Sequence, residues 1–224
     1  GAAPRDLGQT PADLVVLSFS DSDLGAFAAG WHRGRASLPS LRLANLAGLT
    51  HPLSVDTYIE RTLSQARGIL VRLIGGASWW SYGVEQLSRL ARRNGIALAV
   101  LPADGRPDEA LDRASNLPPS TLRRLSALCD AGGEVAAQAA LAQLALAAGL
   151  YAGPVAGSKA LPPFGFWHPG TGPSDGPPSG AGPLVAIPFY RAWQAAADTD
   201  GIGALIAAFD ARGFRATGLF LPSL

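Results

Sequence analysis

The sequence lacks several features that would assign it to a specialised class of protein. It has one cysteine, Cys129, in 224 residues, which excludes a small scaffold held together by disulfides. Its 18 Lys and Arg residues nearly balance 17 Asp and Glu residues, so it carries no basic field of the kind that drives nucleic-acid binding. No uninterrupted run of about 18 apolar residues occurs, and we expect no membrane-spanning helix. We therefore expect neither a nucleic-acid partner nor a membrane partner.

Methionine is absent as well. Translation begins at methionine, so Gly1 is not expected to be the native start, and we expect a piece of a longer polypeptide. The first residues carry no export signal, and together with the lone cysteine this favours a cytoplasmic protein. What the chain does have is 48% hydrophobic residues, which predicts a folded core rather than a disordered chain.

Short apolar runs alternate with stretches in which apolar residues recur at the spacing of a helix. The runs that predict buried strands are residues 13–19, 41–46, 68–74 and 96–101. The stretches that predict helices are 24–32, 55–66 (with Ser54 as the N-cap), 82–94, 108–114, 120–130 and 134–150. This alternation is typical of an α/β fold with a doubly wound parallel sheet, flavodoxin- or Rossmann-like. We expect the strand order 2-1-3-4, with the extra helices of residues 120–150 as a bundle at one end.

The composition divides the chain into three parts. Residues 5–150 are predicted to form the N-terminal α/β domain. Residues 151–182 are rich in Gly, Pro and Ser and are predicted to be a linker. Residues 183–224 predict a strand, a helix and a strand, so we expect a βαβ unit, with its own parallel pair, that starts a second, truncated α/β domain.

The most unusual stretch, residues 75–83, follows the third predicted strand. Two glycines and three aromatic residues stand out in it: Gly75, Gly76, Trp79, Trp80 and Tyr82. Open α/β sheets bind ligands beyond the carboxyl ends of their strands, glycines permit close approach of a backbone, and aromatic rings can form a wall for a planar ligand. The alternative is a glycine turn whose aromatic side chains pack against a neighbouring domain. No phosphate-binding glycine motif is present.

The chain has three histidines, His32, His51 and His168, and none is paired at the spacing of a metal site. His51 and His168 each precede a proline in a loop, and they are the candidate metal ligands because imidazole suits divalent first-row metals such as cobalt. The alternative is that each of them caps or hydrogen-bonds a turn that its proline fixes. No residue can be assigned as catalytic from these patterns.

Five segments, in order along nearly the whole chain, resemble a known family. They are residues 6–24, 45–60 (including Asn45-Leu-Ala-Gly-Leu-Thr-His-Pro), 71–83, 161–169 (Leu161-Pro-Pro-Phe-Gly-Phe-Trp-His-Pro) and 183–224. Together they are similar to the large subunit of the aerobic, ATP-dependent cobaltochelatase, the CobN type, which is related to the magnesium chelatase H subunit. Each motif alone is weak, and the resemblance depends on their common order.

The resemblance implies the N-terminal region of a subunit that inserts Co²⁺ into hydrogenobyrinic acid a,c-diamide, a corrin, in cobalamin biosynthesis. The implied partners are this corrin, the rest of the large subunit, an AAA+ ATPase and a companion chelatase subunit. Cobalt is then the substrate metal, ATP is expected only on the partner subunits, and no cofactor is expected on this chain, which would be inactive alone. Trp79, Trp80 and Tyr82, with Gly75 and Gly76, become candidate corrin contacts, and His51 and His168 candidate metal ligands.

Three roles stay open. The chain could help to enclose or gate the corrin, which predicts that residues 75–83 and His168 face one cleft. It could be a structural or docking domain for the ATPase partners, which predicts Trp79 and Trp80 in a flat, exposed apolar patch. It could instead be an independent small-molecule-binding domain of flavodoxin-like shape, which predicts a closed pocket within residues 13–150.

Overall fold

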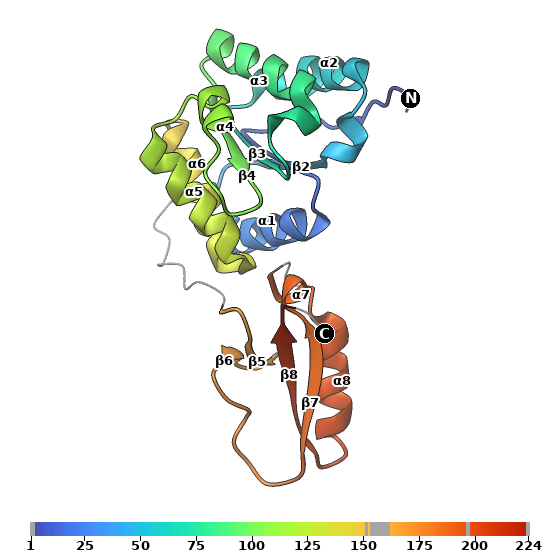
Figure 1. The fold of residues 1–224 in the computed structure, drawn as a ribbon. Coiled ribbons are helices and arrows are strands. Elements are labelled where there is room, and N and C mark those ends of the chain that lie inside the picture. The colour runs from blue at the N-terminus through green and yellow to red at the C-terminus, as the bar shows by residue number, and fades with distance from the viewer. Residues whose placement is uncertain (1–2, 151, 153–161, 196–197, 223–224) are drawn as a thin grey trace.

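The computed structural model describes residues 3–150, 152, 162–195 and 198–222. Two sheets stand one above the other in Figure 1, each with its own helices. We call residues 3–150 the first unit, and the described residues from 162 to 222 the second unit. Each unit has its own hydrophobic core, since the buried clusters of one contain no residue of the other.

The first unit is built on a parallel sheet of four strands in the order β2-β1-β3-β4, as the sequence predicted. The strands are β1 (Leu14–Ser18), β2 (Leu41–Asn45), β3 (Gly68–Leu73) and β4 (Ala97–Pro102). Every residue of β1, β3 and β4 is buried, which is why these strands appear in the sequence as continuous apolar runs rather than alternating ones.

Helices cover both faces of this sheet. The elements of the first unit outside the sheet are α1 (Asp21–Gly34), α2 (Pro52–Arg61), α3 (Ser81–Asn94), α4 (Glu109–Ala114), α5 (Pro119–Ala131), α6 (Gly133–Ala147) and the short 3₁₀ helices η1 (Leu46–Leu49), η2 (Leu63–Gln65) and η3 (Ala77–Trp80). α2, α3 and α4 bury side chains in one core, and α1, α5 and α6 bury theirs in the other. The fold is therefore doubly wound, as predicted.

Two details of the helices differ from the sequence prediction. α2 begins at Pro52, and His51 is its N-cap, because the imidazole Nδ1 accepts a hydrogen bond from the Leu53 N–H at 3.1 Å. Ser54, the predicted cap, is buried, and its Oγ accepts instead from the Arg5 N–H. α5 and α6 do not form a bundle at one end of the sheet. α6 packs along α1 and against β1 and β3, because its small residues, such as Ala137 and Ala140, allow close helix contact.

The second unit contains a mixed sheet in the order β6-β5-β8-β7. Its strands are β5 (Gly165–His168), β6 (Gly172–Ser174), β7 (Leu184–Tyr190) and β8 (Arg215–Leu221), and its helices are α7 (Arg191–Ala195) and α8 (Asp200–Asp210). β7 and β8 form the predicted parallel pair. β5 and β6 lie inside the stretch for which the composition predicted a linker, and β5 pairs antiparallel with β8. Residues 151 and 153–161 of that stretch lie outside the described part.

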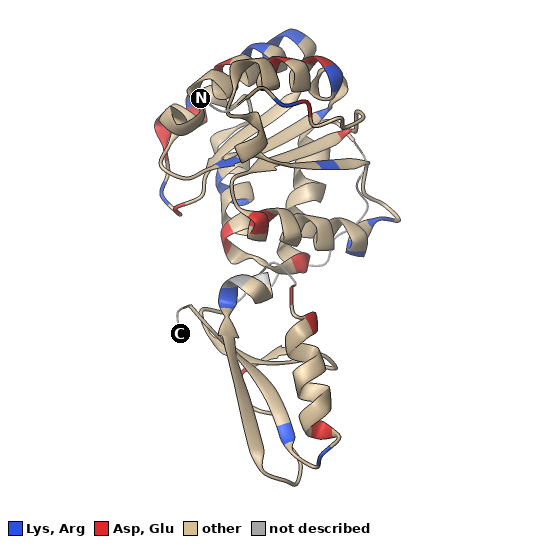
Figure 2. Cartoon of the chain, turned by 90° about the vertical axis from the view of Figure 1, so that its right-hand side faces the viewer, with Lys and Arg blue, Asp and Glu red and all other residues tan. Residues whose placement is uncertain are grey.

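The two units carry different amounts of charge. Figure 2 shows most Lys, Arg, Asp and Glu residues on the helices and loops of the first unit, and few on the second. The units meet at α7, which contacts α1 and α6. Arg191, the first residue of α7, donates from Nη2 to the carbonyl of Ala131 at the end of α5. The second unit therefore touches the first near the carboxyl ends of the strands of the first sheet.

Candidate functional site

The loop after β3 turns sharply at two glycines. Gly75 and Gly76 have φ values of 78° and 85°, a region that side chains other than glycine rarely adopt. A Cβ at position 75 would lie 2.2 Å from Nε1 of Trp79. The glycines therefore let the indole of Trp79 lie directly against the backbone of the loop.

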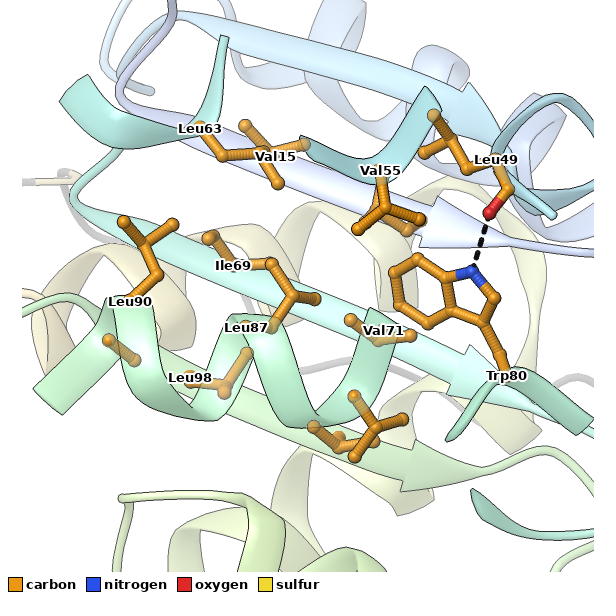
Figure 3. Close-up of a cluster of buried hydrophobic side chains, with 14 of the residues drawn as sticks. Val15, Leu49, Val55, Leu63, Ile69, Val71, Trp80, Leu87, Leu90 and Leu98 are labelled. Carbon is orange, nitrogen blue, oxygen red and sulfur yellow. Dashed lines mark hydrogen bonds between the residues drawn. The ribbon is translucent and has the colours of Figure 1, made fainter. Parts of the chain in front are cut away.

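The two neighbouring tryptophans have opposite environments. Trp79 is 71% exposed, whereas Trp80 is only 5% exposed. Trp80 lies in the core, close to Val55, Val71 and Leu87, and its Nε1 donates to the carbonyl of Leu49 at 2.8 Å (Figure 3). The ring of Trp80 therefore packs against the side chains between the sheet and its helices, and the ring of Trp79 is the exposed one of the two.

Tyr82, in the first turn of α3, is 36% exposed. Its hydroxyl donates to the carboxylate of Asp56 at 2.8 Å, and this hydrogen bond, with a smaller effect of desolvation, raises the pKa of Tyr82. Leu53 on α2 and Ile74 before the glycines are each 57% exposed. The exposed apolar side chains at this edge of the sheet suit a docking surface as well as contact with a flat ligand, but Trp80, which the docking interpretation placed in the exposed patch, is buried.

The two candidate metal ligands hold turns beside their prolines, as the alternative interpretation predicted. His51 caps α2, as described above. Nδ1 of His168 accepts from the Gly170 N–H at 3.1 Å, and its Nε2 lies 3.4 Å from Oδ2 of Asp210. The two histidines lie in different units. Within the described residues, no group of three or more His, Cys, Asp or Glu side chains could hold a metal ion.

A crevice lies at the carboxyl ends of β1, β3 and β4, where the chain leaves β1 and β3 in opposite directions. Its volume is about 460 Å³. It is lined by Ser22, Asp23, Ala26, Phe27, Arg72, Ala103, Asp104, Gly105, Leu128, Cys129, Asp130, Gly132, Gly133, Ala137 and Arg191. None of the residues proposed from the sequence is among them. The position is the one at which open α/β sheets bind ligands.

An arginine in the wall of the crevice organises its polar groups. Arg72 on β3 is in register with Ser18 on β1, and it is 5% exposed. Its Nη1 donates to Asp23 at 2.9 Å and its Nη2 donates to Asp130 at 2.7 Å. Ser18 donates from Oγ to the other carboxylate oxygen of Asp23 at 2.8 Å. These contacts tie two strands, the start of α1 and the end of α5 together.

The charge of Arg72 is balanced within this network. Burial alone would lower the pKa of Arg72, but the neighbouring Cys129, Asp23 and Asp130 raise it above its ordinary value. Burial raises the pKa of the Cys129 thiol to about 12, so this thiol is neutral at ordinary pH. Nε of Arg72 is buried and has no hydrogen-bond partner among the described residues. Buried donors without a partner are uncommon in native proteins.

Sequence reasoning missed this crevice, although one signal was present. Arg72 interrupts the apolar run of residues 68–74, and a strand buried on both faces has no free side on which to place a charge. The alternation of side chains also places Arg72 on the face of Leu70, toward α1. A charged residue in such a strand predicts a paired, buried network.

In the described part of the chain, no helix has the length and apolar character needed to cross a membrane. No protein-family model matches the chain. It is 39% identical over 234 residues to the aerobic cobaltochelatase subunit CobN of Sinorhizobium sp., a match that covers 98% of this chain and 18% of that protein. It is 37% identical over 236 residues to the subunit of the same name in Pseudomonas aeruginosa, with 100% of this chain and 19% of that protein covered.

The fold has a counterpart among solved structures. The catalytic subunit of cobaltochelatase from Mycobacterium tuberculosis matches it with a TM-score of 0.68 at 22% identity, over 94% of this chain and 16% of that one. The chain spans about a fifth of the length of the curated relatives that it matches. On the strength of that sequence identity and the shared fold, the chain belongs to the family of CobN-type cobaltochelatase subunits.

Proposed function

We propose that this chain is a region of a cobaltochelatase subunit that inserts Co²⁺ into hydrogenobyrinic acid a,c-diamide, with ATP hydrolysed by partner subunits, one of them an AAA+ ATPase. The observation that carries the proposal is the identity of 37–39% to two CobN subunits over 98–100% of the chain. Cobalt is the substrate metal in this proposal. Because the chain matches about a fifth of those subunits, we propose that it contributes binding surface and is inactive alone.

Within that proposal, the exposed part of the loop after β3 contacts the flat face of the corrin. Trp79 supports this role because its indole is largely exposed and lies against the glycine turn. An aromatic side chain offers a large apolar area for contact with the face of a macrocycle. Tyr82 is held at the edge of the same loop by Asp56. Trp80 supports the loop from the core.

A titration of the chain with hydrogenobyrinic acid a,c-diamide, followed through the absorption band of the corrin, tests this role. Replacing Trp79 with Ala removes an exposed ring, so we expect binding to weaken by about tenfold without loss of folding. Trp193→Ala is the matched control, because Trp193 is an exposed tryptophan of the second unit, 45% exposed. Equal affinity for both variants would contradict the corrin role of Trp79.

A docking function is the second candidate, and the exposure of Leu53, Ile74 and Trp79 favours it. If the chain does not bind the corrin up to its solubility limit, the docking role becomes the better proposal.

The chelatase assignment itself is tested separately. The matching region of the Pseudomonas aeruginosa subunit is replaced by this chain, and cobalt insertion is assayed with the partner subunits. Loss of cobalt insertion in a folded chimera would contradict the chelatase assignment.

A further inference from the structure

The crevice at the carboxyl ends of the strands is distinct from the loop that carries Trp79. Its volume of about 460 Å³ lies toward the lower part of the range of roughly 300–1,000 Å³ found for ligand pockets. It therefore suits a side arm of a large macrocycle rather than the ring itself. Both units contribute to it, since Arg191 of α7 lines it together with residues of the first unit.

The charges around the crevice nearly cancel. Three carboxylates line it, those of Asp23, Asp104 and Asp130, and two guanidinium groups, those of Arg72 and Arg191. α6 begins at Gly133 in the same wall, and the N-terminus of a helix adds a partial positive charge. A carboxylate in the crevice would face Asp130 and Asp104, and an ammonium group would face Arg72 and Arg191. The balance favours an uncharged polar group.

The lining of the crevice contains both donors and acceptors. The donors are the first N–H groups of α6, which no side chain caps, and Arg72, which also lines the crevice and whose buried Nε has no hydrogen-bond partner among the described residues. The acceptor is Asp130, whose Oδ1 accepts from Arg72. Its Oδ2 lies 3.9 Å from the position that a Cβ of Gly105 would take, so the glycine leaves space beside that oxygen. The side chain of Asp130 is 39% exposed.

A primary carboxamide is an uncharged group that accepts at its oxygen and donates from its nitrogen, both bonded to one carbon. Its oxygen accepts from N–H groups, and its NH₂ donates to a carboxylate. A carboxylate offers no donor to Asp130, and an ammonium group offers no acceptor to the N–H groups of α6. We propose that the crevice binds a carboxamide side arm of the corrin and that Asp130 selects the amide over the corresponding carboxylate. This inference rests on the proposed function.

The test compares two corrins on the whole chain. The affinity for hydrogenobyrinic acid a,c-diamide is measured beside that for the acid with carboxylates at the same two positions. A site built on hydrogen bonds discriminates strongly against a partner that leaves a buried group unpaired. We expect the diamide to bind at least about tenfold more tightly than the acid.

Asp130→Asn turns the acceptor into a group that can also donate, so the variant accommodates a carboxylate. We expect its preference for the diamide to fall to near one. Asp104→Asn is a second variant, at an exposed turn that lines the same crevice, and it should reduce the preference in part. Asp175→Asn, an exposed aspartate of the second unit, is the control and should keep the full preference. Thermal unfolding of each variant shows that it is folded.

The outcomes separate the two proposals. Binding of the diamide with no preference over the acid overturns the inference while the proposed function stands. A preference that survives in Asp130→Asn also overturns it. Binding of neither corrin overturns the corrin-binding role and the carboxamide site together.

Discussion

Arg72 on the central strand β3 and Asp130 in the last turn of α5 form an ion pair with a nitrogen–oxygen distance of 2.7 Å. The residues are 58 positions apart in the sequence. The pair joins the sheet to the helix hairpin of α5 and α6, and it forms one wall of the crevice. Asp23 holds the other side of the same guanidinium. The crevice therefore depends on one buried cation for its shape.

Replacing Arg72 with Met should lower the free energy of unfolding of the first unit. The substitution leaves Asp23 and Asp130 without their partner, and removal of one member of a fully buried pair costs about 3–5 kcal/mol. Because Asp130 is 39% exposed, we expect a smaller loss, about 2–3 kcal/mol. Urea unfolding followed by circular dichroism measures it.

Arg89→Met is the control for that experiment. Arg89 pairs with Glu85 one turn earlier on α3, and its side chain is 67% exposed. Surface pairs of this kind contribute about 0.3–0.5 kcal/mol. An equal loss of unfolding free energy in the Arg72 and Arg89 variants would show that the crevice network does not stabilise the fold.

Gly83 in α3 lies beneath the ring of Trp80, and a Cβ there would come within 2.1 Å of the indole. In an open helix, Gly→Ala stabilises by roughly 1 kcal/mol. Gly83→Ala should destabilise instead, by about 1–3 kcal/mol, because the indole must shift in a packed core. Gly203→Ala in α8 meets only ordinary contacts, at 3.8 Å or more, and should be neutral or stabilising. Thermal unfolding compares the two, and the same sign for both would contradict this packing.

Much of the fold could be predicted from the sequence, because strands buried on both faces appear as apolar runs that polar, helical stretches separate. The parallel sheet followed from that alternation, and the strand order that we expected is confirmed. β5 and β6 were missed because strands of four and three residues among glycines and prolines carry too little periodicity to detect. The helix start at Pro52 was missed because His51, an uncommon cap, takes the place expected of Ser54.

The candidate site was less predictable. A pattern cannot tell which of two adjacent aromatic residues is buried, and the 3₁₀ turn of η3 places Trp79 and Trp80 on opposite sides. The crevice is formed by segments far apart in the sequence, so no local motif marks it. The sequence signal for the polar network in the crevice was Arg72, a charged residue inside a buried strand. The position of the crevice followed from the topology once the strand order was established.

The stability of the chain should fall in alkaline solution. Burial raises the pKa of the Cys129 thiol from 9.0 to about 12 in the folded state. Above pH 9 the unfolded chain releases this proton while the folded chain keeps it, so stability is lost as the pH rises, at up to about 1.4 kcal/mol per pH unit. Urea unfolding at pH 8, 9 and 10 measures the slope. Cys129→Ala should flatten this slope between pH 8 and 10, and an unchanged slope would contradict the raised pKa of the thiol.

Arg191 should govern how firmly the second unit is held against the first. It donates from Nε to the carbonyl of Pro162 and from Nη2 to the carbonyl of Ala131, and so it joins the C-terminal end of α5 to the second unit. Arg191→Ala removes both contacts, and we expect a larger radius of gyration by small-angle X-ray scattering with little change in the unfolding of either unit. Arg212→Ala is the matched control, because Arg212, just beyond the end of α8, donates to Ala208 within its own unit. If both variants scatter like the unaltered chain, contacts other than those of Arg191 hold the two units together.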